Sequence, residues 1–480
     1  MKKKTLAGLF WSFAERIGAQ LVGFAVSIVL ARLLMPEEYG ILAIVLVFIN
    51  LCNVFVDSGF GRALIQKKDA DELDFSSAFY VGLVVSVVLY VFLYAVAPWI
   101  SKFYDMEILT PLLRVMGLRL IVAAYSSVQK AKVSREMQFR RFFFSTLGGT
   151  VVSAAVGITV AWLGYGVWAL VAQDMTNAVI NALILSLTIR WRPRLMFSLA
   201  RTKELFRFGW KVLVGSLLDT LYEEFRSLYV GKLYTTDDLA YYTRGKQFPH
   251  LIVDNVNSSV NSVLFPAIAS QQGDLAAMKN MTRRAMKTSS YILTPMLFGL
   301  MAVMEPLVSL VLTDKWLPCV PYAQLLCISC ALTPLQTANL QAIYAMGRSD
   351  IALKLNVWKR LFGFSMVVVF GRISVIAMAR AGVATAVVSL ALNMSPNKKL
   401  LNYGSFEQIR DVLPAWLMAG AMMLPVYLVG LLGLPLAASL ALQVLTGVIA
   451  YVLMSVLFRV ESFRYLLDTV KSVLARASAK

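Results

Sequence analysis

The chain has 480 residues, of which 59% are hydrophobic and 15% are charged, and its mean hydropathy is +0.69. This composition excludes a soluble globular protein, because repeated runs of about 20 apolar residues are typical of helices that cross a membrane. A formal net charge of +19 would suggest nucleic-acid binding in a soluble protein. In a membrane protein, the placement of basic residues first reflects topology.

Apolar stretches of helical length follow one another along the chain. We predict fourteen spans, at residues 8–31, 40–61, 76–98, 108–129, 143–163, 166–188, 208–231, 239–268, 288–312, 319–343, 357–372, 375–394, 412–432 and 435–458. The eleventh and twelfth are separated only by the short turn 371–374. The loops are too short for a separate soluble domain. The sequence therefore predicts an all-α integral membrane protein.

The basic residues are unevenly divided between the two sides of this predicted bundle. Loops on one side, together with both termini, hold most of the 46 Lys and Arg residues. The loops on the other side hold only Arg32, Lys102, Lys232, Lys315 and Arg372. Because loops rich in Lys and Arg remain in the cytoplasm, we predict that both termini are cytoplasmic. This topology accounts for most of the net charge without nucleic acid.

An internal repeat divides the chain into two halves of six spans. ARLLMPEEYG (Ala31–Gly40) matches GKLYTTDDLA (Gly231–Ala240), with a basic residue and paired acids at the turn between two spans. Six spans separate the two turns, so the halves share one orientation, as in transporters with parallel repeats. We predict an N-terminal lobe at 1–195, a C-terminal lobe at 196–396, and two extra spans with a cytoplasmic tail at 397–480. Chance similarity between apolar helices remains the alternative.

The segment LDTLYEEFRSLYVGK, residues 218–232, concentrates charge within a predicted span. At 100° per residue, Asp219, Glu223 and Arg226 fall on one stripe of the helix. Glu224 lies off this stripe, and we expect it to meet a neighbouring helix or the outer interface. Charges at membrane depth are costly and usually functional. The stripe is therefore a candidate lining for a cleft between the lobes.

Other predicted spans also carry polar faces. The candidate substrate-binding residues are Arg226, Lys246, Arg244, Arg119, Arg114 and His250, and the candidate residues for ion coupling or internal pairing are Asp219, Glu223, Asp254, Glu15 and Arg16. Arg and Lys side chains complement phosphate oxygens, so such a cavity suits an anionic substrate. The alternative is that buried polar pairs hold helices together, which we favour for Asn50, Asn53 and Asp57.

Sequence motifs for a metal or catalytic centre are weak. CISC (Cys327–Cys330) has metal-motif spacing but lacks a second ligand pair. DAD (Asp69–Asp71) has the Asp-x-Asp form of some glycosyltransferases but stands in a short loop without a nucleotide-binding domain. We therefore predict no metal site, no catalytic residues and no enzymatic activity.

Several long segments resemble a known transporter family. They are residues 31–69, 164–173, 208–222, 245–267 and 337–357. In these segments the chain is similar to polysaccharide exporters of the multidrug/oligosaccharidyl-lipid/polysaccharide superfamily, in particular the colanic-acid and teichuronic-acid exporter branch. The resemblance implies a flippase of the bacterial inner membrane. It would move undecaprenyl-pyrophosphate-linked oligosaccharide by alternating access, with two six-helix lobes around a cationic cavity.

The resemblance also implies binding partners, and two alternative functions remain open. The expected partners are the lipid-linked oligosaccharide, membrane lipids and a polysaccharide polymerase. We expect a monomer without a cofactor, in which transport is coupled to H⁺ or Na⁺. A multidrug antiporter of the same superfamily is one alternative, and a membrane glycan ligase, polymerase or glycosyltransferase is another. The acids Glu223 and Glu224, where this branch more often has amides, and Arg380 in the twelfth span depart from the family pattern.

Overall fold

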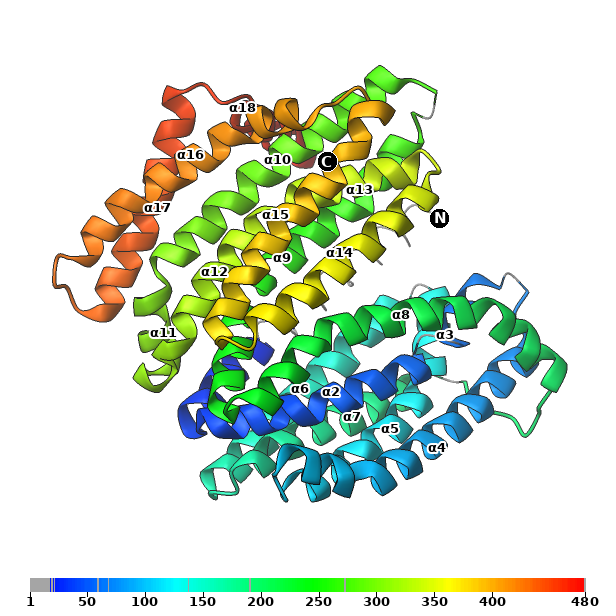
Figure 1. Cartoon of the computed structure of the whole chain (residues 1–480). Helices are drawn as coiled ribbons and strands as arrows, with labels where there is room; N and C mark the ends of the chain where they lie inside the picture. The colour runs from blue at the N-terminus through cyan, green and yellow to red at the C-terminus, as the bar shows by residue number, and fades with distance from the viewer. Residues whose placement is uncertain are drawn as a thin grey trace. The chain divides into compact units, whose positions relative to one another are not determined.

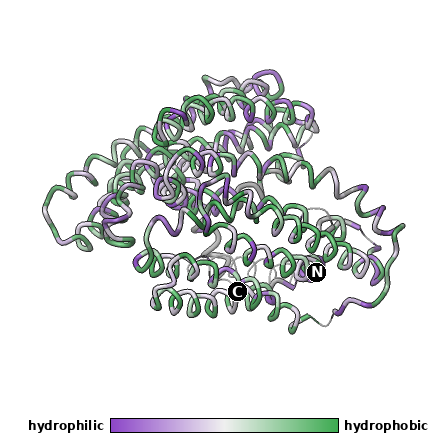
Figure 2. The backbone as a smooth tube through the Cα atoms, turned by 60° about the horizontal axis from the view of Figure 1, so that its bottom comes forward, coloured by the Kyte–Doolittle hydropathy of each residue, from purple (hydrophilic) through white to green (hydrophobic). Residues whose placement is uncertain are grey.

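The computed structural model describes residues 18, 20, 22–57, 60–67, 69–136, 138–189, 191–271 and 273–478. Within these ranges the regular elements are α-helices and one 3-10 helix, without strands. Hydrophobic residues run along most of the helices, and hydrophilic stretches interrupt them (Figure 2). The all-α membrane fold class is thus confirmed. The chain divides into two compact units, Met1–Ala240 and Tyr241–Lys480.

The first unit consists of long helices joined by short turns (Figure 1). A short apolar helix, Val22–Leu33, precedes α2 (Pro36–Asp57), α3 (Phe60–Gln66), α4 (Glu72–Tyr104), α5 (Leu109–Arg135), α6 (Phe139–Trp162), α7 (Val167–Thr188), α8 (Leu199–Leu233) and the start of α9 (Thr236–Ala269). The consecutive helices α4 and α5 pack together, as do α6 and α7. Helix α8 packs against α2, α3 and α4. It therefore belongs to the first unit by packing, whereas the repeat-based boundaries at 195 and 396 stay a prediction.

The second unit continues from α9 to the C-terminal helix. It contains α10 (Leu275–Ala302), α11 (Met304–Leu312), η1 (Asp314–Cys319), α12 (Val320–Ala331), α13 (Thr333–Ala345), α14 (Ser349–Phe370), α15 (Val375–Leu400), α16 (Ser405–Gly430), α17 (Leu436–Leu457) and α18 (Glu461–Ser478). Helix α10 packs against α12, α13 and α16, and α16 packs against α17. The buried side chains of α10, α13, α15 and α16 form one apolar core.

A helix or a broken pair of helices occupies each predicted span from the second onward. Nine helices in the described ranges are long and apolar enough to cross a membrane, and the α10–α11 pair, bent by 68°, makes a tenth. Helices α8, α9 and α14 are long but fall outside this set, because charged, amide and hydroxyl side chains lower their hydropathy. The total of fourteen spans stays a prediction, and α3 and α18 are helices that the sequence analysis did not predict.

The two turns of the internal repeat touch each other in the first unit. A Cβ atom built on Gly40 would lie 1.9 Å from the carbonyl oxygen of Thr236, and one built on Gly231 would lie 3.1 Å from the side chain of Ile44. The first of these distances is far below van der Waals contact. Only glycine at position 40 lets α2 approach the start of α9 this closely.

A cluster of ion pairs joins α3, α4 and α8 at one end of the first unit. Lys67 Nζ lies 3.0 Å from Asp74 Oδ1 and 2.9 Å from Glu204 Oε2. Asp71 caps α4, with its side chain accepting a hydrogen bond from the Asp74 amide while Asp74 bonds back to the Asp71 amide. This capping box satisfies two amides that a helix start leaves unpaired. The cluster fixes the beginning of α4 against the neighbouring helices.

The ion pairs of this cluster predict a pH dependence. The hydrogen bond from Lys67 holds the pKa of the Glu204 carboxyl below its usual value, and that from the Asp74 amide lowers the pKa of Asp71. Both pKa values are lower in the folded state, so their stabilisation is fully present above the unfolded values of about 4. It is lost as the pH falls through the folded values.

We therefore expect the melting temperature of the purified protein to fall as the pH is lowered below about 4. Glu204→Gln should make this fall shallower, whereas Glu305→Gln, at an exposed acid, should leave it unchanged. Identical acid profiles for the wild type and Glu204→Gln would argue against the assignment.

Candidate functional site

An ion pair between two spans of the first unit joins α5 to α7. Arg119 Nη1 donates to Asp174 Oδ2 at 2.6 Å, and the two side chains are 28% and 30% exposed. Asp57 of α2 lies within electrostatic range of Arg119 and of Lys130 on α5. Arg119, predicted as a substrate contact, thus has an internal carboxylate partner. These groups form a mixed-charge cluster between three helices rather than a purely cationic surface.

Asp174 is a site residue that the sequence analysis missed. It begins a polar stripe with Asn177 and Asn181 on α7, at spacings of three and four residues that place them on one face. Asn177 Nδ2 donates to Ser153 Oγ of α6 at 3.3 Å. This periodicity within the predicted span 166–188 is the signal that could have identified Asp174.

Arg114 is held by an aromatic ring instead of an acid. Its guanidinium carbon lies 4.1 Å from the centre of the Tyr94 ring on α4. Its Nε atom is buried without a hydrogen-bond partner among the described residues. A cation stacked on a ring keeps its charge with less desolvation cost than one enclosed by apolar side chains. Arg114 therefore retains hydrogen-bonding capacity at the α4–α5 contact.

The charged stripe on α8 combines exposed acids with a cation that lies beside an aromatic ring. Asp219 and Glu223 are exposed, and the guanidinium carbon of Arg226 lies 5.9 Å from the Tyr222 ring centre. Glu224 Oε1 accepts a hydrogen bond of 3.0 Å from Asn50 Nδ2 on α2. This contact confirms the expectation that Glu224 meets a neighbouring helix. It also confirms that Asn50 holds two helices together.

The remaining basic candidates lie on α9. Arg244 is 7% exposed, donates to Gln247 Oε1 at 2.7 Å and lies 5.0 Å from the Trp316 ring centre on η1. The neighbouring Gly245 lets α9 pack against η1, since a Cβ there would lie 2.9 Å from the carbonyl oxygen of Cys319. This contact orients the part of α9 that belongs to the second unit.

Three further candidates continue along α9 from this contact. Lys246, His250 and Asp254 follow at four-residue intervals and therefore share one face of α9. Lys246 and Asp254 are both within electrostatic range of Cys330 on α12, and Asp254 is exposed. His250 is half-buried.

The candidates thus form groups within each unit. Arg114 and Arg119 belong to the first unit, as does the stripe of α8, whereas Arg244, Lys246, His250 and Asp254 belong to the second. A single cavity that collects all of them stays a prediction. Glu15 and Arg16 lie outside the described residues, and Arg380 is exposed on α15.

The described residues do not form a metal-binding cluster. No group of three or more His, Cys, Asp or Glu side chains there is close enough to hold a metal ion. Cys319, Cys327 and Cys330 are buried thiols that form no disulfide. In the described ranges the CISC segment is therefore part of the helix packing.

The sequence of this chain matches a model of a known protein family. The model described as "Polysaccharide biosynthesis protein" matches residues 29–321, which is more than half of the chain. The chain belongs to the polysaccharide biosynthesis protein family. The match begins in the helix before α2 and ends at the start of α12, so it includes every described site residue discussed above except Cys327, Cys330 and Arg380.

Relatives of this family member have similar lengths and low identities. The lipopolysaccharide biosynthesis protein WzxC of Escherichia coli (strain K12) is 25% identical over 382 residues, covering 78% of this chain and 76% of that protein. The succinoglycan biosynthesis transport protein ExoT of Rhizobium meliloti (strain 1021) is 25% identical and covers 68% and 66%. The teichuronic acid biosynthesis protein TuaB of Bacillus subtilis (strain 168) is 24% identical and covers 73% of each. The predicted resemblance to polysaccharide exporters is confirmed by the family match and these relatives.

Solved structures show the fold of this family member. The lipid II flippase MurJ in an inward closed conformation matches with a TM-score of 0.77 at 15% identity, covering 96% of this chain and 100% of that one. An inward-facing multidrug resistance MATE family transporter of the MOP superfamily matches with a TM-score of 0.62 at 16% identity, covering 80% and 96%. The chain has the fold shared by these transporters.

Proposed function

We propose that this protein is a flippase that translocates a lipid-linked oligosaccharide across the bacterial inner membrane by alternating access, with both termini in the cytoplasm. The family match over residues 29–321 is the observation that carries the proposal. Three relatives are named for lipopolysaccharide, succinoglycan and teichuronic acid biosynthesis, and the fold is that of a lipid II flippase. The substrate class is therefore a glycan attached to undecaprenyl pyrophosphate.

The charged candidates receive roles in this proposal. Arg226, Arg244 and Lys246 bind the phosphates of the substrate, because guanidinium and ammonium groups complement phosphate oxygens; Arg114, Arg119 and His250 complete this set. The acids Asp219, Glu223 and Asp254, with the pair Glu15 and Arg16, serve coupling to H⁺ or Na⁺ or internal pairing. The protein works as a monomer beside a polysaccharide polymerase, and neither a cofactor nor nucleic acid takes part.

Deletion of the gene tests this function. Loss of the protein should leave undecaprenyl-linked repeat units on the inner leaflet, and expression of the wild-type chain should reverse the accumulation. Labelled lipids extracted from the cells give the amount, and access of an external glycan-binding probe in spheroplasts gives the leaflet. If the lipid-linked units do not accumulate, the proposal fails; export of organic cations instead would support the multidrug alternative.

Two substitutions test the substrate contacts. Arg226→Ala and Lys246→Ala should each reduce export roughly tenfold or more while leaving membrane insertion intact, because a hydrogen bond to a charged group contributes about 1.5–3 kcal/mol. Lys398→Ala, at an exposed position of α15, is the matched control and should export normally. Wild-type export by either test variant would remove that residue from the site.

A further inference from the structure

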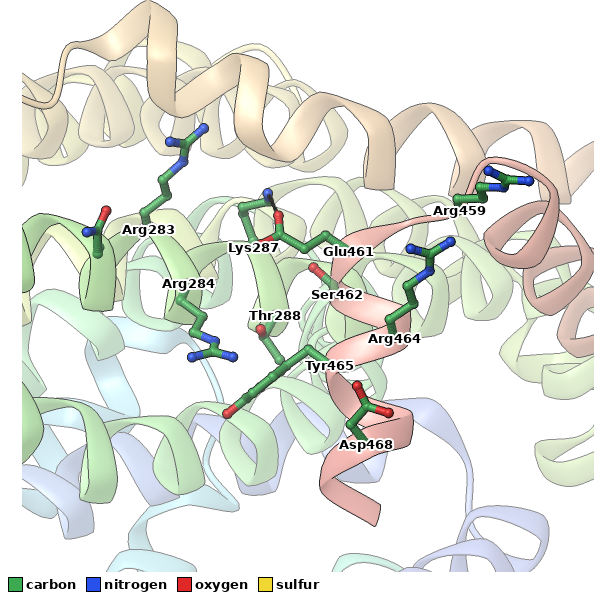
Figure 3. A pocket seen from close by; sticks show the side chains of 11 residues that line it. Arg283, Arg284, Lys287, Thr288, Arg459, Glu461, Ser462, Arg464, Tyr465 and Asp468 are labelled. Atoms are coloured by element: carbon green, nitrogen blue, oxygen red, sulfur yellow. Dashed lines mark hydrogen bonds and ion pairs between the residues drawn. The ribbon is translucent and has the colours of Figure 1, made fainter. Parts of the chain in front are cut away.

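A basic pocket lies in the second unit, where the first half of α10 faces the α17–α18 turn and α18. Its volume is about 700 Å³, and Figure 3 shows the side chains around it. Five lining side chains are basic and two are acidic: Arg283, Arg284, Lys287, Arg459 and Arg464, with Glu461 and Asp468. The basic candidates for the transport site lie on other helices, so this pocket is a separate feature.

Two of the basic side chains on α10 already have acidic partners. Lys287 Nζ lies 2.5 Å from Glu461 Oε2 at the start of α18. Arg283 Nη2 lies 2.6 Å from Asp411 Oδ1 on α16, outside the pocket. In Figure 3 the Arg283 side chain extends away from α18, whereas Lys287 reaches across to Glu461. These pairs hold α10, α16 and α18 together. Of the two acids that line the pocket, Glu461 is already paired with Lys287.

The other three basic side chains are not neutralised in this way. The Arg284 guanidinium carbon lies 3.8 Å from the ring centre of Tyr465, a contact that positions the group and keeps its charge. Arg459 and Arg464 form no ion pair with any residue in the described part of the chain. Both extend to the same side of the first turn of α18 in Figure 3. Two guanidinium groups held on one side of a concave surface favour a bound anion.

The pocket lies at the depth where the apolar spans end. On α10 the basic residues stop at Lys287, and the apolar stretch continues from there to Ala302; α17 is apolar up to Leu457. Helix α18 is amphipathic, and Phe463 and Leu466 pack against the core formed by α10, α16 and α17. An amphipathic helix that follows a membrane span lies in the interface, with its polar side among the lipid headgroups.

We propose that this pocket binds the phosphate headgroup of an acidic phospholipid in the leaflet beside α18. Arginine matches phosphate oxygens with paired N–H donors. Groups of four to eight basic residues next to a membrane span or on an amphipathic helix bind acidic lipids. The bound lipid secures α18 against α10 and α17. The proposal depends on neither the transported substrate nor the side of the membrane.

Lipid binding to the purified full-length protein tests this proposal. The probes are phosphatidylglycerol, phosphatidylcholine, inorganic phosphate and inorganic pyrophosphate, with binding followed by native mass spectrometry and by the melting temperature. The test variant combines Arg459→Gln with Arg464→Gln. The matched control combines Lys398→Gln with Lys399→Gln, two exposed basic residues in the last turn of α15 that lie outside the pocket.

The wild type and the control should bind phosphatidylglycerol and melt at a higher temperature in its presence than in phosphatidylcholine. The Arg459/Arg464 double variant should bind it roughly 25-fold more weakly, because each interfacial basic residue contributes a factor of about five. Equal binding by the double variant would overturn the proposal. An equal effect of free phosphate or pyrophosphate would overturn the lipid as the source. If the double variant does not fold, Arg464→Gln alone should show about a fivefold loss, and an unchanged affinity would overturn the proposal.

Discussion

Replacement of Gly40 by alanine is expected to destabilise the first unit more than a glycine-to-alanine replacement at any other described position in its helices. The new Cβ would lie 1.9 Å from the Thr236 carbonyl oxygen and 2.5 Å from its carbonyl carbon. These are backbone atoms, so no side-chain rotation relieves the clash, and α2 must move away from the start of α9. Overpacking typically costs about 1–3 kcal/mol, and we expect the upper end of this range here.

The melting temperature of purified protein measures this effect. A loss of about 3 kcal/mol should lower it by roughly 6–12 °C, and Gly40→Val should abolish the yield of monodisperse protein. The control is Gly215→Ala on α8, where an added Cβ meets no atom within 4 Å. A Gly40→Ala protein as stable as this control would contradict the contact between the two repeat turns.

Removal of either partner of the Arg119–Asp174 pair should strongly impair the protein. Each single alanine variant leaves a charge without its partner between apolar helices, which costs about 3–5 kcal/mol at a fully buried site. Because both side chains are 28–30% exposed, we expect about 1–3 kcal/mol. Export should fall further than the amount of folded protein, since Asp57 and Lys130 lie near the same charges.

A double-mutant cycle separates this pair from its surroundings. Arg119→Ala combined with Asp174→Ala should be less destabilised than the sum of the single variants, with a coupling energy of about 0.5–3 kcal/mol. Lys102→Ala at the exposed end of α4 controls for the loss of one positive charge. Additive effects of the two alanine substitutions would show that the 2.6 Å contact does not contribute to folding.

Features that repeat along one helix could be predicted from the sequence. Apolar runs identified the spans, because the length needed to cross a membrane is set locally by the rise of the helix. The same periodicity placed Asp219, Glu223 and Arg226 on one stripe and Glu224 beside it. The hydrogen bond from Asn50 to Glu224 bears out that placement. A break such as that between α10 and α11 also changes the direction of a span, which hydropathy does not report.

Contacts between helices could not be predicted from the sequence. Helical periodicity shows which side chains share a face but not which helix that face meets. Nothing in the sequence near Arg119 indicates that Asp174, 55 residues away, is its partner, or that Tyr94 stacks on Arg114. The sequence likewise does not indicate that α8 packs within the first unit or that Arg284 approaches Tyr465. The membrane class, the helices and their polar faces depend on local geometry, so the amino-acid sequence is enough to predict them. The partner of each charged side chain depends on how helices far apart in the sequence pack together, and it is visible only in the folded chain.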